Sequence, residues 1–132
     1  MKTAKRIFVV CALGLGAALV AGAAGATSYT MTTTVTTDGV QSLAGGTLSI
    51  ACRTSSSSPW TSCGSSVASG TQVSIDAVAN DGYWFMWFTT NPYLAGCSTT
   101  NWGWGYHANP ETHCGFTMPA GNVNLNAEFQ LP

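Results

Sequence analysis

Residues 122–129 read NVNLNAEF, and this stretch near the end of the chain decides the fold class. Apolar and polar side chains alternate along it without a break. Because successive side chains of a β-strand point to opposite faces, the pattern predicts a strand with one face in a hydrophobic core. The apolar positions are Val123, Leu125, Ala127 and Phe129, and the polar positions between them are Asn124, Asn126 and Glu128. The turn-forming residues Pro119-Ala120-Gly121 separate this strand from another predicted strand, Cys114 to Met118.

Further upstream the sequence predicts more strands and no helix. Residues 72–79 (QVSIDAVA) alternate in the same way, and the turn signal Asn80-Asp81-Gly82 separates them from an aromatic stretch, residues 83–90 (YWFMWFTT). Two more stretches, residues 29–37 (YTMTTTVTT) and 47–53 (TLSIACR), lie nearer the N-terminus. We therefore expect a small all-β single domain, an antiparallel sheet or sandwich-like fold.

The first 26 residues have the organisation of a secretory signal peptide. Three basic residues among the first six precede an uncharged apolar run, residues 7–20, and Ala24-Gly25-Ala26 fits the small-residue cleavage pattern. A retained membrane anchor is the alternative, but the second half of the apolar run consists of Ala and Gly, and no basic flank follows. Cleavage after Ala26 leaves residues 27–132 as one secreted domain, extracellular or at the cell surface.

Charged residues make up only 7% of the chain, far below the roughly 25% that is typical of soluble domains. Outside the predicted signal peptide, Arg53 is the single basic side chain. The acidic residues are Asp38, Asp76, Asp81, Glu111 and Glu128. One basic residue cannot neutralise a run of phosphates, so nucleic-acid binding is excluded, and so is polybasic docking on a membrane. Such a weakly charged surface costs little to desolvate, which favours association between copies.

Four cysteines lie beyond the predicted signal peptide: Cys52, Cys63, Cys97 and Cys114. An even number of cysteines in a short secreted chain is typical of a disulfide framework. Of the three possible pairings we favour the sequential one, Cys52 with Cys63 and Cys97 with Cys114, because it closes two short loops. Each bridge would stabilise the domain by about 3 kcal/mol in the simple loop-entropy model.

Two longer stretches resemble a known family. Gly70 to Trp87 reads GTQVSIDAVANDGYWFMW, and Phe116 to Phe129 reads FTMPAGNVNLNAEF. The order of a Gly-Thr strand, a Gly-Tyr-x-Phe-x-x-Trp signature and a closing Phe-Thr-Met-Pro-Ala-Gly strand is similar to that of the divergent internalin B-repeat family of bacterial repeat domains. In this chain Trp87 stands one place early in the signature, or Phe88 takes its slot.

The resemblance covers residues 29–129 and implies a small all-β extracellular module, usually repeated or appended to larger surface proteins. It implies no catalytic residue and no cofactor. Many secreted members place cysteine pairs where Cys52/Cys63 and Cys97/Cys114 stand here. This chain departs from the family in carrying a single copy, and in a longer and more aromatic segment between the last two cysteines.

No set of residues predicts an enzyme or a metal site. Two histidines and two cysteines have the chemistry of zinc ligands, but their spacing matches no standard zinc pattern, and secretion favours disulfides. These residues are His107, His113, Cys97 and Cys114. The sequence has no G-x-S-x-G motif for a nucleophilic serine. Asp76 and Glu128 are predicted on outward strand faces and the other acids in turns or loops, so no carboxylate pair for glycoside hydrolysis is expected.

The aromatic residues form two groups. Those expected in the core are Tyr83, Phe85, Trp87 or Phe88, and Phe129, and because Trp84 alternates with Phe85, one of these two faces away from the core. The predicted ligand or partner contacts are the loop residues Trp60, Trp102, Trp104 and Tyr106. Exposed rings of this kind stack on sugars or form protein–protein hot spots. The alternative is that they cover the core of their own loops.

Residues 27–37 also have two interpretations: the first strand of the domain, or a segment that adds to the sheet edge of a neighbouring copy. With the low charge, this predicts a non-catalytic structural or adhesive module that associates with itself or with another surface protein, as a fibre or cell-surface subunit. The alternative function is a carbohydrate-binding module that uses the loop tryptophans.

Overall fold

A computed structural model describes residues 26–97 and 112–132 of the chain. In this part every regular element is a strand, as the alternation predicted. The strands are β2 (Ser28–Thr37), β3 (Val40–Gln41), β4 (Gly46–Arg53), β5 (Thr61–Ser62), β6 (Ser66–Ala68), β7 (Gln72–Ala79), β8 (Trp84–Asn91), β9 (His113–Thr117) and β10 (Val123–Gln130). None of the described residues forms a helix with the length and hydropathy of a membrane span.

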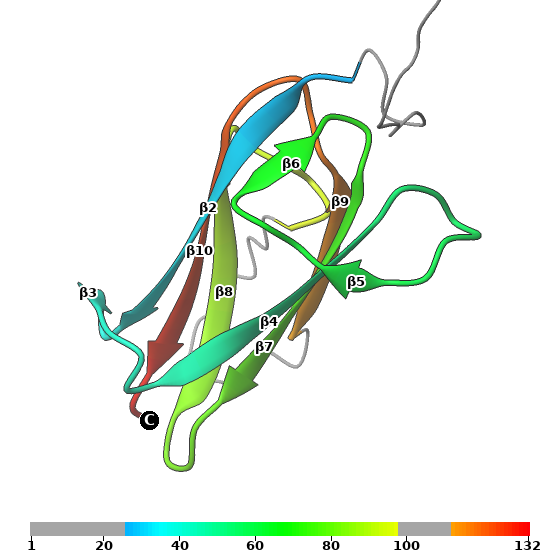
Figure 1. The fold of residues 1–132 in the computed structure, drawn as a ribbon. Coiled ribbons are helices and arrows are strands. Elements are labelled where there is room, and N and C mark those ends of the chain that lie inside the picture. Colours follow the sequence, from blue (N-terminus) through cyan, green and yellow to red (C-terminus); the bar gives the residue numbers. More distant parts are fainter. Residues whose placement is uncertain (1–25, 98–111) are drawn as a thin grey trace, which may run out of the picture.

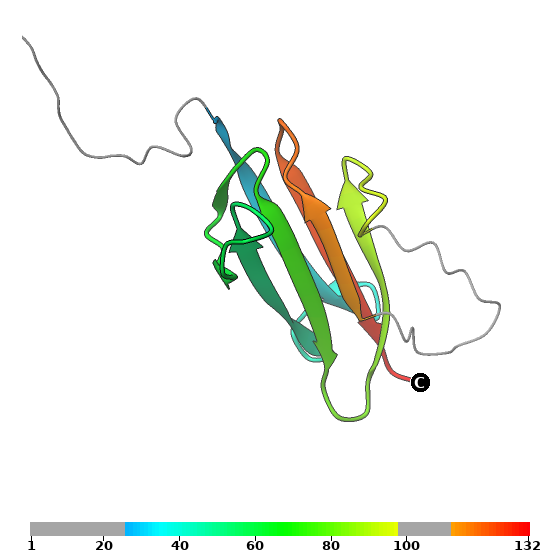
Figure 2. The same ribbon diagram turned by 90° about the vertical axis from the view of Figure 1, so that its right-hand side faces the viewer.

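The strands form two sheets that pack face to face (Figure 1). The five-stranded sheet has the order β3-β2-β10-β8, and β6 also pairs with β2. The four-stranded sheet has the order β5-β4-β7-β9; Figure 2 shows β4 and β7 in green beside β9 in orange. The predicted sandwich-like, all-β fold is confirmed.

One pairing is parallel, which local patterns could not predict. β10 runs parallel to β2, from the pair Val123–Met31 to the pair Phe129–Thr37, and antiparallel to β8. A parallel pair needs a long connection between its strands, and here nearly the whole domain separates the two. The five-stranded sheet is therefore mixed, and its first and last long strands lie side by side.

The core lies between the sheets and is centred on β10. All four apolar positions of this strand are at most 1% exposed, as the alternation predicted. From the other sheet, Val73 and Ile75 on β7 are at most 2% exposed. β4 begins against this core, because a Cβ atom at Gly46 would collide with the Phe129 ring and would lie 2.5 Å from the Val78 carbonyl oxygen. The close approach of β4 and β10 therefore requires glycine at this position.

A β-bulge in β8 decides which aromatic residues are buried. Glu128 pairs with Trp87 and Phe129 with Phe85, so Met86 is an extra residue in β8. The bulge lets Phe85 and Phe88, three positions apart, both face the core, at 2% and 0% exposure. Their ring centroids are 4.6 Å apart, and the Phe85 centroid is 5.5 Å from that of Phe129. Phe88 thus takes the core position that the sequence left open between it and Trp87.

Two side chains differ from the predictions. Tyr83, expected in the core, is only half-buried because it lies before β8, at the end of the turn in which its N–H donates to the Asn80 carbonyl. Glu128 was expected on an outward face and alternates correctly, yet it is only 4% exposed. Its carboxylate accepts hydrogen bonds from the Thr36 hydroxyl and, at 2.9 Å, from the Gly39 N–H. The β2–β3 turn therefore covers it.

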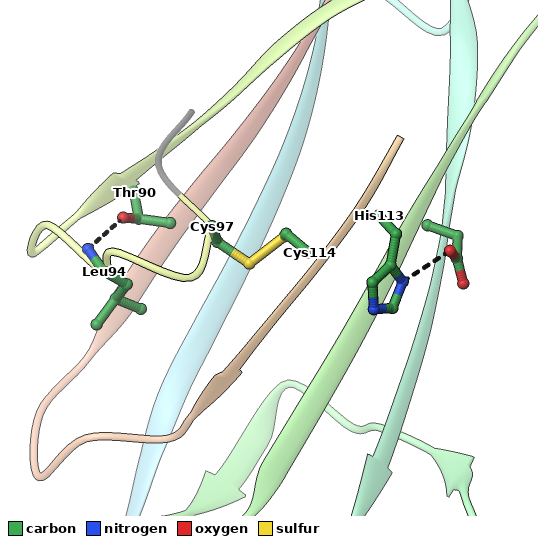
Figure 3. Close-up of a disulfide and its surroundings, with 6 residues drawn as sticks. Thr90, Leu94, Cys97, His113 and Cys114 are labelled. Carbon is green, nitrogen blue, oxygen red and sulfur yellow. Dashed lines mark hydrogen bonds and ion pairs between the residues drawn. A yellow bond between two sulfur atoms is a disulfide. The ribbon is translucent and has the colours of Figure 1, made fainter. Parts of the chain in front are cut away.

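The two expected disulfide-tied loops are present. Cys52 bonds to Cys63 and Cys97 bonds to Cys114, the sequential arrangement. The second bridge lies in the core, with both cysteines at most 2% exposed, and connects the segment after β8 to β9 (Figure 3). The Thr90 hydroxyl accepts a hydrogen bond of 2.8 Å from the Leu94 N–H and fixes the chain just before Cys97.

Candidate functional site

Of the four predicted contact residues, Trp60 lies in the described part of the chain. It lies in the loop closed by the Cys52–Cys63 bridge, and its side chain is 44% exposed. The other three, Trp102, Trp104 and Tyr106, lie outside the described residues. The candidate surfaces in the described part of the chain are the surroundings of Trp60 and the exposed parts of the two sheets.

Trp60 is held in place by Arg53, the last residue of β4. The Arg53 guanidinium carbon lies 4.3 Å from the centroid of the Trp60 ring, within the range of a cation–π contact. Arg53 Nε in turn donates to Gln72 Oε1 at 2.7 Å, and Arg53 Nη1 donates to the Ser56 carbonyl at 3.2 Å. The β4–β7 register places Arg53 opposite Gln72, so the sheet itself fixes the position of the ring.

The outer face of the four-stranded sheet has a hollow beside Trp60. The middle row of that face, across β4, β7 and β9, carries only small residues, because Ala51 pairs with Ser74 and Ser74 pairs with Gly115. The resulting hollow has a volume of about 310 Å³. We call it the furrow, and define it by six of its lining residues: Trp60, Gln72, Ser74, His113, Gly115 and Thr117.

Larger polar side chains stand at both ends of the furrow. At one end Gln72 pairs with Thr117, and at the other Asp76 pairs with His113. His113 Nδ1 lies 2.8 Å from Asp76 Oδ1, with both side chains more than half exposed (Figure 3). The furrow thus combines an aromatic ring, an amide, hydroxyls and an imidazole on one sheet, and the Asp76 carboxylate lies beside the imidazole. These groups can stack on a ligand and can donate hydrogen bonds to it or accept them from it.

A second hollow lies between the two sheets, where the edges of β2 and β4 face each other. Its volume is about 560 Å³, and none of its lining residues is charged. We call it the groove; it is lined by Thr33, Thr34, Val35, Gln41, Ser42, Leu43, Thr47, Leu48 and Ile50. Leu43 and the nearby Val40 are 65% and 66% exposed. This side of the sandwich therefore presents apolar surface to solvent.

The strand edges beside the groove are only partly covered. On its outer side β2 pairs with β6 at Ser28–Thr30 and with β3 at Thr36–Thr37. β4 pairs along its whole length with β7, but its other side pairs with β5 only at Ala51 and Cys52. Within the described residues, the outer edge of β4 from Gly46 to Ile50 has no strand partner.

Residues 28–37 form β2 and belong to the sheet of the domain itself. From Met31 to Thr37 the strand pairs with β10, so the structure agrees with the interpretation of this segment as the first strand. In residues 26–97 and 112–132, no three His, Cys, Asp or Glu side chains come together in a way that would hold a metal ion. Cys97 and Cys114, considered as zinc ligands, are instead bonded to each other.

Neither hollow was identified from the sequence. The signal for the furrow was present in the small outward-facing residues Ala51, Ser74 and Gly115, but their alignment depends on the register of three strands. The groove depends on which two strands end up as neighbouring edges of different sheets. Sequence reasoning did identify Trp60, because an exposed tryptophan in a Ser-rich loop stands out.

One comparison with known proteins gives a match. The chain matches the model of the divergent InlB B-repeat domain over residues 26–131. No curated protein and no solved structure matches the chain. The matched region contains every described strand and both disulfides. The chain therefore belongs to the divergent InlB B-repeat domain family, which points to a typically non-catalytic repeat module of cell-surface or extracellular proteins.

Proposed function

We propose that this chain is a secreted, non-catalytic structural or adhesive module that associates with a second copy of itself. The observation that carries the proposal is the outer edge of β4, Gly46–Ile50, which has no strand partner within residues 26–97 and 112–132 and lies beside the uncharged groove. The second copy would contribute its own β4 edge. Because the same surface would then be used on both copies, the contact would have two-fold symmetry.

The backbone of this edge favours such pairing. An unpaired strand edge presents N–H and C=O groups that can bond to another chain, and proteins that must avoid this protect the edge with Lys, Pro or a covering segment. Residues 46–50 (GTLSI) contain neither Lys nor Pro. Antiparallel pairing of two such segments would satisfy these backbone groups on both copies.

Side chains beside the edge add an apolar contribution. Leu48 and Ile50 face the groove and are only half-buried, and Leu43 at its rim is 65% exposed. Full burial of a leucine side chain contributes roughly 1.5–3 kcal/mol. No ion has to be desolvated in the groove, since none of its lining residues is charged.

The test is the sedimentation of residues 27–132 over a range of concentrations, for the natural chain and for Leu43→Lys. We expect assembly that increases with concentration in the natural chain and is lost in Leu43→Lys, since a lysine there would bring two like charges together. Leu131→Lys is the matched control, because Leu131 is also exposed, at 55%, and does not line the groove. A monomer at every concentration would refute self-association, and equal loss in both variants would refute the groove as its site.

A further inference from the structure

We propose that the furrow beside Trp60 is a carbohydrate-binding site that takes a pyranose ring of a neutral glycan. This goes beyond self-association, and it uses a different surface. The furrow lies on the outer face of the four-stranded sheet, whereas the groove lies between the two sheets. Either function can therefore fail without the other.

The shape of the furrow fits a flat, elongated ligand. The lining residues His113 and Thr117, at its two ends, are four residues apart on β9, which corresponds to about 13 Å along a strand. Between them Ser74 and Gly115 leave the sheet surface low. At about 310 Å³ the hollow is near the lower limit of small-ligand sites, which span roughly 300–1,000 Å³. That size suits one or two sugar rings of a longer chain.

Trp60 gives this hollow its wall for stacking. The Trp60 ring lines the furrow. Arg53 lies over this ring but does not itself line the furrow. The chain of contacts from Gln72 through Arg53 to the ring holds the indole in position before a ligand arrives. A side chain ordered in advance loses less conformational entropy on binding, so more of the contact energy remains as affinity.

The polar groups around the furrow match the hydroxyls of a neutral sugar. Gln72, Ser74 and Thr117 line the furrow and can both donate and accept hydrogen bonds. The Asp76 carboxylate lies just beyond one end, bonded to His113. Arg53, the only cationic side chain beyond the predicted signal peptide apart from any protonated histidine, already bonds to Gln72 and Ser56. With a carboxylate at one end and its arginine engaged, the site disfavours phosphate or sulfate groups.

The test is titration of residues 27–132 with cellohexaose, chitohexaose and mannohexaose, followed by calorimetry and by the indole N–H resonance of Trp60. We expect at least one hexaose to bind and to shift this resonance. Trp60→Ala should weaken that binding about tenfold or more, as expected for truncation of a central aromatic contact. Ser74→Val should weaken the binding comparably, because the methyl groups of the valine would fill the hollow. Valine is β-branched and therefore compatible with the strand conformation of β7.

Tyr93→Ala is the matched control and should leave the affinity unchanged, because Tyr93 is an exposed aromatic residue, at 67%, that does not line the furrow. The proposal is overturned if none of the three hexaoses binds. It is also overturned if binding persists at full strength in both Trp60→Ala and Ser74→Val, each checked by thermal unfolding to be folded.

Discussion

β10 and β4 are strands of equal length with a similar alternation, yet they differ in strand pairing and in the burial of their inward side chains. β10 pairs with β2 on one side and β8 on the other, and its inward side chains are at most 1% exposed. β4 pairs fully only with β7, and its inward residues Leu48 and Ile50 remain half-buried. The difference comes from the neighbouring strands, because β10 lies between the long strands β2 and β8, whereas the outer neighbour of β4 is the two-residue strand β5.

This contrast separates stability from function. The strand that is covered on both sides holds the hydrophobic core, so changes in it should affect folding. The strand with a bare edge adjoins both hollows, since Leu48 lines the groove and Ala51 lies in the row of small residues that crosses the furrow. Changes there should affect binding or assembly more than folding. Three sets of variants and one exchange measurement test this division.

The largest effect is expected for Phe129→Ala. Phe129 is fully buried and packs against Phe85, so its truncation should lower the free energy of unfolding by about 3–5 kcal/mol. Leu48→Ala in β4 should cost clearly less, because its side chain is smaller and is already partly exposed. Urea unfolding of both variants measures the difference. Equal losses in the free energy of unfolding would show that β4 contributes as much to the hydrophobic core as β10 does.

Removal of the disulfides should come next. Replacement of both cysteines of either bridge by serine should cost about 3 kcal/mol. The Cys97–Cys114 bridge should cost more than the Cys52–Cys63 bridge, because it closes the longer loop, 17 against 11 residues, and its sulfurs lie in the core. Thermal unfolding of the two double variants gives the order. A larger loss for the Cys52 and Cys63 variant would contradict the view that the edge side is less important for stability.

A smaller effect is expected for Thr36→Val on β2, beside β10. The Thr36 hydroxyl donates to the buried Glu128 carboxylate and accepts from Asn126 Nδ2 at 2.9 Å. Valine keeps the shape but removes both bonds, which should cost about 1–3 kcal/mol. Thr32→Val is the matched control; Thr32 is exposed on the same strand, and its change should stay within about 0.5 kcal/mol. If chemical unfolding shows no difference between the two variants, the hydrogen bond from Thr36 to Glu128 does not contribute to the free energy of unfolding.

Much of the fold followed from the sequence because its causes are local. The alternation of β7 and β10, the turns between strands and the cysteine spacing each depend on neighbouring residues. The parallel pairing of β2 with β10, the bulge at Met86 and the burial of Glu128 depend on contacts between distant segments. No pattern within one strand carries that information.

The candidate sites were predictable only in part, for the same reason. Trp60 could be chosen from its loop, but its contact with Arg53 and the hollow beside it arise from the register of β4, β7 and β9. The contact roles of Trp102, Trp104 and Tyr106 remain predictions. For Glu128 the sequence predicted the correct face of the strand but not its burial, because the β2–β3 turn covers the side chain.

Hydrogen exchange at low and high protein concentration tests whether the outer edge of β4 joins two copies. Exchange reports which backbone amides are protected. We predict that at high concentration the amides on the outer edge of β4, within residues 46–50, gain protection, while those of β10 stay as they are. Protection that is unchanged with concentration, or gained at β8 or β9 instead, would contradict the account.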